Sequence, residues 1–78
     1  MEMELDLHGK NLFQARIAVQ SALARATSAD YRLTVIHGYS GGTALRDMLH
    51  EEFGKHPRVL RMERGRNPGQ TVLVLREY

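Results

Sequence analysis

Twice in this 78-residue sequence, a strand-like segment ends in a His-Gly pair and a helix-like segment follows at once. Residues 3–8 alternate strictly between apolar and polar side chains, which is the period of a half-buried β-strand. Residues 32–37 form a β-branched run that is apolar on both faces at its centre, as an interior strand is. The two junctions, at residues 8–9 and 37–38, predict consecutive strand–helix units within one α/β domain.

Helical patterns follow both junctions. Residues 12–26 carry apolar side chains at three- and four-residue steps, and Asn11 with Gln14 predicts a capping box at their start. A second apolar stripe occupies residues 45–53, with Thr43 as its predicted N-cap.

The last third of the chain predicts a β-hairpin. Residues 58–64 and 71–76 have strand patterns, and residues 65–69 between them are dense in turn residues. In the first of these strands we expect Leu60 and Met62 to face one way and Val59 and Arg61 the other. The order β-α-β-α-β-β predicts a two-layer α/β sandwich, with a four-stranded mixed sheet and two helices, as a single domain over residues 1–78.

Composition excludes several classes of protein. The chain has no cysteine, so it forms no disulfide framework and no thiolate metal site. No apolar run approaches the roughly 18 residues that cross a bilayer, and the acidic N-terminal segment is unlike a signal peptide. We therefore expect a cytoplasmic domain with no membrane partner.

The basic side chains are concentrated in the last third of the chain. Residues 55–78 carry six basic and two acidic side chains, although the net charge of the whole chain is only +2. Most of the basic residues are arginines, whose planar guanidinium suits phosphate groups and base edges. This pattern favours a nucleic-acid partner, and an ordinary solvated surface is the alternative.

A cluster of reactive side chains is expected where the first two strands end. Parallel strands joined by a helix end at the same edge of a sheet, which is where open α/β sheets bind ligands. Asp6 and His8 are two residues apart on the first strand pattern and therefore share a face, and His37 ends the second. Two imidazoles and a carboxylate can move a proton and activate a phosphodiester, so these three are the candidate catalytic residues. Each also has a structural alternative, as a strand-end hydrogen-bonding group or a helix cap.

A glycine-rich turn lies between the second strand and the second helix. Its backbone N–H groups, together with the helix start, predict a phosphate site, although the turn is not a P-loop. Tyr39 can stack on a base. His50 and His56 have no neighbouring partner in the sequence and are expected to be solvated. The residues expected to hold phosphate or to supply positive charge are Gly38, Tyr39, Ser40, Gly41, Gly42, Thr43, Arg46, Arg58, Arg61, Arg64 and Arg66.

The motif pair resembles the Smr (small MutS-related) domain family. The resemblance rests on the segments Leu5-Asp6-Leu7-His8-Gly9, Ile36-His37-Gly38, Thr43-Ala44-Leu45-Arg46 and the closing Asn67–Leu75 hairpin. It implies the β-α-β-α-β-β fold that the C-terminal domain of a bacterial translation initiation factor shares. It also implies binding to DNA or RNA, with nicking or endonuclease activity in some members, and maps the motif positions of the family onto Asp6, His8, His37 and Gly38.

One position departs from the family pattern. Where the family has its second glycine, this chain has Ser40, and the turn before Thr43 is one residue longer, so Gly41 or Gly42 is the alternative. The departure bears on phosphate geometry, and therefore on cleavage more than on binding.

Two functions from different classes follow. The first is a nucleic-acid-binding domain with endonuclease activity at Asp6, His8 and His37. The second is a non-catalytic RNA- or ribosome-binding module that uses the same site only to anchor phosphate. A small-nucleotide-binding domain is weaker, since the chain has no adenine or ribose signature. The sequence leaves open the choice between DNA and RNA, the need for Mg²⁺ or Mn²⁺, and the oligomeric state.

Overall fold

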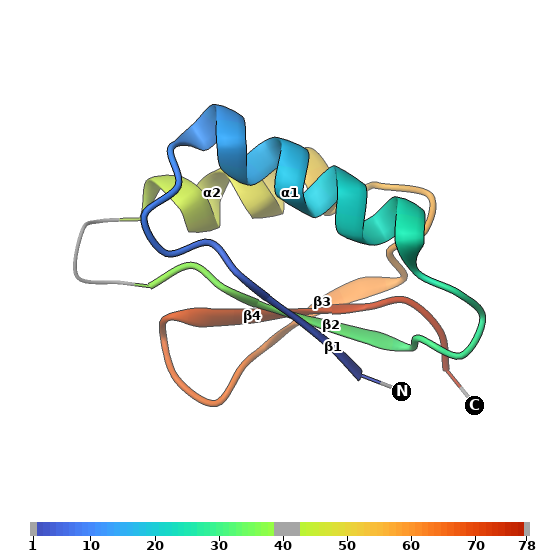
Figure 1. Ribbon diagram of the computed structural model, residues 1–78. Helices are drawn as coiled ribbons and strands as arrows, with labels where there is room; N and C mark the ends of the chain where they lie inside the picture. Colours follow the sequence, from blue (N-terminus) through green and yellow to red (C-terminus); the bar gives the residue numbers. More distant parts are fainter. Residues whose placement is uncertain (1, 39–42, 78) are drawn as a thin grey trace.

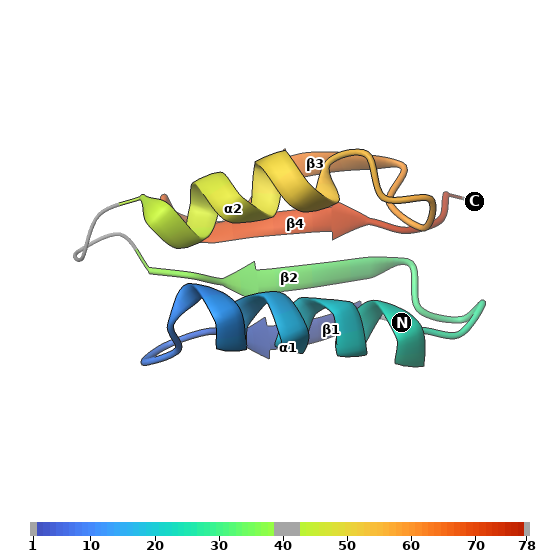
Figure 2. The ribbon, with the colours of Figure 1, turned by 90° about the horizontal axis from the view of Figure 1, so that it is seen from above.

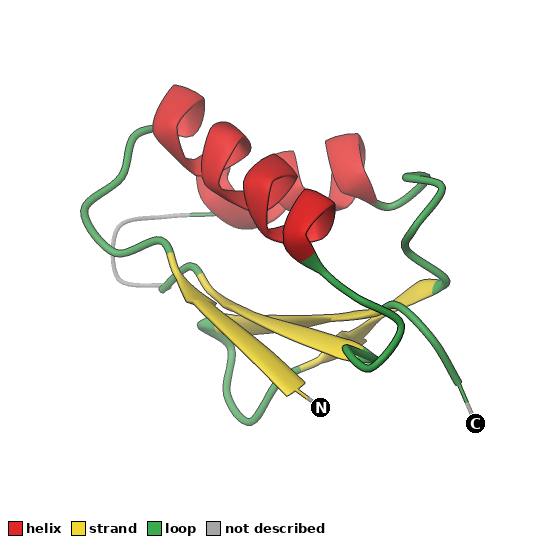
Figure 3. Ribbon diagram, turned by 45° about the vertical axis from the view of Figure 1, so that its right-hand side comes forward, coloured by secondary structure: helices red, strands yellow, loops and turns green. Residues whose placement is uncertain are grey.

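The computed structural model of the protein describes residues 2–38 and 43–77. Within these residues, the helices and strands are β1 (Glu2–Asp6), α1 (Leu12–Arg25), β2 (Arg32–Ile36), α2 (Ala44–Phe53), β3 (Arg61–Arg64) and β4 (Gln70–Val74). Both helices lie on one face of the sheet and leave the other face open (Figures 1 and 3). The predicted two-layer α/β fold and the order of its elements are confirmed. No helix of the described residues is long and apolar enough to cross a membrane.

The sheet is mixed, with the strand order β1-β2-β4-β3. β1 and β2 are parallel, whereas β4 is antiparallel to both β2 and β3. Asp6 lies opposite Ile36 in the β1–β2 register, so the two strands end together, as the sequence predicts. Seen from above, α1 covers β1 and β2, while α2 covers β4 and β3 (Figure 2).

The hydrophobic core fills the space between the helices and the sheet. Its fully buried leucines come from the strands, from both helices and from the segment after β1, namely Leu7, Leu23, Leu33, Leu49 and Leu73. Leu33 and Val35 alternate in β2 with half-buried Arg32 and Thr34, which fixes the covered and the open face of the sheet. The helices are also joined at their surface, where the Arg16 guanidinium donates to Glu52 over 2.5 and 2.8 Å.

Several of the segments that connect strands and helices lie at one end of the molecule. The ends of β1 and β2, the starts of α1 and α2, and the β3–β4 turn all lie there, at the left in Figure 1. We call this the loop end and define it as residues 7–11, 37–38, 43 and 65–69.

Several strand boundaries differ from the sequence prediction, and backbone hydrogen bonds explain two of the differences. β1 ends at Asp6, because residues 7–10 form a turn closed by the Lys10 N–H bond to the Leu7 carbonyl at 3.0 Å. β3 begins at Arg61 and not at residue 58, because the Val59 N–H turns back to the His56 carbonyl at 2.9 Å.

The later start of β3 changes which side chain enters the core. Val59 is buried at 7% exposure, whereas Leu60 is 57% exposed and Met62 packs against the core. The expectation that Leu60 shares the face of Met62 was therefore wrong, since strand alternation does not extend through a turn.

A chain of ion pairs crosses the open face of the sheet. Arg32 lies 3.4 Å from Glu2 and 3.3 Å from Glu63. Arg61 lies 2.8 Å from Glu63 and 2.7 Å from Glu77. The register places Val74 between the two arginines, and their aliphatic stems account for its burial on an otherwise uncovered face.

The capping box predicted for α1 is present and gives a stability test. The Asn11 side chain accepts the Gln14 N–H at 2.8 Å, and the Gln14 side chain accepts the Asn11 N–H at 3.0 Å. We expect Asn11→Ala to lower the free energy of unfolding by about 1 kcal/mol, measured in urea, because it leaves a helix N–H without its partner. Asn11→Ser is the control and should retain most of the stability. Equal losses in both variants would contradict the capping role.

Candidate nucleic-acid interface

Asp6 and His8 meet in the turn that follows β1. The Asp6 carboxylate accepts the backbone N–H of His8 at 2.8 Å, and Gly9 completes the turn with a φ of +77°. Both side chains are exposed. Asp6 therefore shapes the turn that presents the His8 imidazole, while its second oxygen stays open to solvent.

His37 is held differently, because both of its ring nitrogens have partners. Nδ1 lies 2.8 Å from the Gly38 carbonyl, and Nε2 lies 2.9 Å from the Thr71 hydroxyl. A carbonyl only accepts, so Nδ1 carries a proton, and Nε2 of the neutral ring accepts from Thr71. The residue is 8% exposed. These contacts fix the ring at the point where β2 ends.

The sheet separates these two groups. Thr71 lies opposite buried Val35, so it and the His37 ring are on the helix-covered face. Asp6 alternates with Leu5, which packs against the core, so its carboxylate is on the open face. The structure thus brings Asp6, His8 and His37 to one edge, with Asp6 and His37 on opposite faces. Among residues 2–38 and 43–77, no three His, Asp or Glu side chains form a group that could hold a metal ion.

The backbone ties the end of β2 to the hairpin. The N–H groups of His37 and Gly38 both donate to the Gly69 carbonyl, at 2.9 and 3.0 Å. Gly38 has a φ of +75°, a conformation that favours glycine. The next four predicted phosphate-turn residues, Tyr39, Ser40, Gly41 and Gly42, lie outside the described residues.

The starts of the two helices differ. α1 is closed by its capping box, whereas Thr43 occupies the N-cap position of α2 without making a side-chain cap. Its hydroxyl donates instead to the Asp47 carboxylate at 3.0 Å. The described residues therefore supply no side-chain partner to the first N–H groups of α2, and such groups attract anions.

The arginines predicted to supply charge fall into two sets. Arg46, Arg64 and Arg66 line a groove of about 640 Å³ between α2 and the β3–β4 hairpin. Arg58 and Arg61 are bound elsewhere. Arg58 donates to the Ala26 carbonyl at 2.6 Å and so closes the C-terminal end of α1. Hydrogen bonds to Glu77 and Glu63 raise the pKa of Arg61 and largely neutralise its field.

Two residues of this region escaped the sequence analysis. His50 also lines the groove, one helical turn after Arg46, and this spacing was the signal that places the two on one face of a helix. Thr71 holds His37, but only the register of β4 against β2 shows it.

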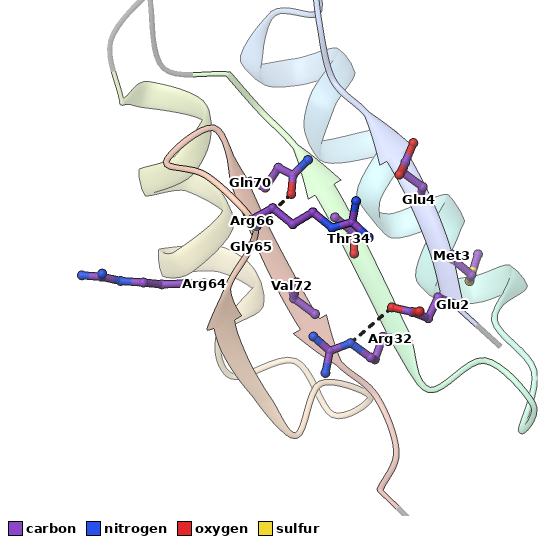
Figure 4. A pocket seen from close by; sticks show the side chains of 10 residues that line it. All are labelled: Glu2, Met3, Glu4, Arg32, Thr34, Arg64, Gly65, Arg66, Gln70 and Val72. Carbon is purple, nitrogen blue, oxygen red and sulfur yellow. Dashed lines mark hydrogen bonds and ion pairs between the residues drawn. The ribbon is translucent and has the colours of Figure 1, made fainter.

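A second hollow lies on the open face of the sheet, with a volume of about 440 Å³ (Figure 4). There the Arg66 side chain extends over the sheet toward Thr34, while Arg64 points away from the hollow. Glu2 and Glu4 of β1 line the other side. The charge of this hollow is therefore mixed, since Arg32 and Arg66 line it together with these carboxylates.

The His37–Thr71 hydrogen bond gives a second test. We expect Thr71→Val to lower the free energy of unfolding by about 1–3 kcal/mol, because it leaves a buried ring nitrogen without a partner. Thr71→Ser keeps the hydroxyl and should lose less. Urea unfolding and ¹⁵N chemical shifts of the imidazole check the stability and the proton on Nδ1. A ring protonated only on Nε2 would contradict the assignment.

The comparisons with known proteins agree with this geometry. The Smr domain family model matches residues 5–75. Among solved structures, the chain is similar to the Smr domain of Thermus thermophilus MutS2, with 31% sequence identity and a TM-score of 0.83, over 96% of this chain and 99% of that one. No curated protein matches the chain. The family carries an association with nucleic-acid binding and nicking endonuclease activity. Since the match spans nearly all of the residues that build the sheet and both helices, this chain belongs to the Smr domain family.

Proposed function

We propose that this domain binds nucleic acid at its loop end, with a backbone phosphate seated where α2 begins. The observation that carries the proposal is the contrast between the helix starts: α1 is closed by its own side chains, while Thr43 leaves the start of α2 uncapped. An anionic oxygen satisfies such N–H groups and also interacts favourably with the helix dipole. The sequence prediction that residues 39–42 hold phosphate remains part of this proposal.

The distribution of charge also favours binding of nucleic acid near the start of α2. On the open face the carboxylates of Glu2, Glu4 and Asp6 offset the charges of Arg32 and Arg66, whereas Arg46 and Arg64 lie on the side of α2 and the hairpin. A polyanion is therefore attracted to the helix-covered side of the loop end. We propose a cytoplasmic setting, which the absence of cysteine supports.

Phosphodiester cleavage is the second candidate function, and the Asp6–His8 turn favours it. We propose that His8 takes a proton from a water molecule as that water attacks phosphorus, while the P–O bond to the leaving oxygen breaks and this oxygen takes up a proton from solvent. Asp6 holds the turn through its bond to the His8 backbone N–H and places a negative charge in the same turn. His37, with both nitrogens engaged, positions the phosphate turn through Gly38 and Thr71. In the non-catalytic alternative, an RNA- or ribosome-binding module, the same residues only anchor phosphate.

Binding is tested by its dependence on salt. We expect log Kobs for a fluorescein-labelled oligonucleotide to fall linearly with log salt concentration, with a slope of about −0.7 to −0.9 for each phosphate neutralised. Fluorescence anisotropy at several KCl concentrations measures it for both DNA and RNA. An affinity that does not change with salt would contradict phosphate anchoring.

Catalysis is separated from binding by one isosteric change. We expect Asp6→Asn to abolish cleavage of branched DNA or structured RNA, because it removes the charge and keeps the oxygen that accepts the His8 N–H. Binding should change less than about twofold, since no phosphate contact is lost. His8→Ala should behave likewise, and assays with and without Mg²⁺ or Mn²⁺ show whether a metal is needed. A wild-type domain that binds but cleaves neither substrate would leave the anchoring module as its function.

A further inference from the structure

We propose that the groove between α2 and the β3–β4 hairpin binds a second phosphate of the same nucleic acid. This inference rests on the proposed function and deepens it, because it assigns a path for the chain beyond the loop end. The bound molecule then runs from the start of α2 along the side of that helix, with Arg46 and Arg64 holding the second phosphate.

The charges around the groove make it an anion site. Arg64 has no acidic partner among the described residues, and Arg46 has only a long contact of 3.9 Å with Asp47. Both acids that line the groove are already engaged: Asp47 accepts from Thr43, and Glu63 pairs with Arg32 and Arg61. The guanidinium groups are therefore free to pair with an outside anion, and arginine does so with two parallel hydrogen bonds to phosphate.

The hairpin that carries Arg64 is held firmly in place. Its turn is closed by the Gly69 N–H bond to the Asn67 side chain at 2.9 Å and by the Arg66 N–H bond to the Gln70 side chain at 3.1 Å. A Cβ at Gly65 would lie 2.3 Å from the Gln70 Cβ, so the two sides of the hairpin touch at this point. A backbone that is already fixed loses little conformational freedom when the side chain it carries binds an anion, which favours affinity.

The groove is connected to the loop end by Thr71. This residue lines the groove, and its hydroxyl is bound to His37 at the end of β2. Arg64 lies opposite Thr71 in the β3–β4 register, on the helix-covered face. A phosphate beside Arg64 and a phosphate at the start of α2 therefore lie on the same side of the sheet, where a single backbone can follow both. His50, one turn beyond Arg46 on α2, adds a hydrogen-bond donor along this path.

The test compares charge-removing variants at the two ends of the molecule. We expect Arg64→Gln and Arg46→Gln each to weaken binding of a labelled eight-nucleotide single strand by about tenfold, since each removes a charged hydrogen bond to phosphate. The double variant should also reduce the salt slope by about 0.7–0.9. Arg64→Lys keeps the charge and should recover part of the loss. Arg25→Gln, at the opposite end of α1, removes the same charge and should change affinity less than about twofold.

The outcomes separate this inference from the proposed function. If the wild-type domain binds and the folded Arg46→Gln, Arg64→Gln double variant binds equally well with the same salt slope, the groove holds no phosphate and the loop-end site stands alone. If Arg25→Gln weakens binding as much as Arg64→Gln does, the effect comes from net charge and the groove is again excluded. If the wild-type domain binds no DNA or RNA strand at low salt, the proposed function itself fails. Circular dichroism and thermal melting confirm that each variant is folded.

Discussion

The parallel pairing of β1 with β2 is the constraint on which the rest of this structure depends. Because Asp6 lies opposite Ile36, both strands end at one level and both helices start from there. A parallel pair needs a crossover helix, and α1 supplies it while burying the covered face of the sheet. β3 then brings the chain back to the same end, and the hairpin turn that leads into antiparallel β4 lies there, where Gly69 accepts two N–H groups from the end of β2. The topology therefore places Asp6, His8 and His37 at the same end of the molecule.

The arginines on the two sides of the sheet differ in whether they are paired with carboxylates. On the open face, Arg32 and Arg61 are used internally, each paired with two carboxylates, and they cover Val74. On the covered side, Arg46 and Arg64 have almost no acidic neighbours that are free. A net charge of +2 therefore understates how basic the groove is, because strand alternation keeps Arg61 and Glu63 together on the open face and places Arg64 alone on the covered side.

Most of the fold could be predicted from the sequence, since apolar periodicity, the Asn11 capping box and the His-Gly junctions all mark local structure. The errors lie where local rules do not reach. The start of β3 depends on the turn before Val59, and alternation alone does not show it. The sequence singled out Asp6 and His37, but it did not show that they lie on opposite faces of the sheet. That division depends on where β1 ends and on the hydrogen bond between His37 and Thr71. Arg58 looked like part of a basic patch, and only the packing of the chain brings it to the Ala26 carbonyl.

His37 shows how one side chain can serve the fold and the site together. Its Nδ1 fixes the carbonyl of Gly38, which begins the glycine turn, and its Nε2 holds Thr71, which lines the groove. A ring with both nitrogens engaged is poorly placed to exchange protons with a substrate, but it is well placed to hold the end of β2 against β4, between the two phosphate sites that we propose. The exposed imidazole of His8 has the opposite character: its ring is open to solvent, and only its backbone is held, by Asp6. In the proposed cleavage, proton transfer is therefore assigned to His8 in the turn, and positioning to His37 at the end of β2.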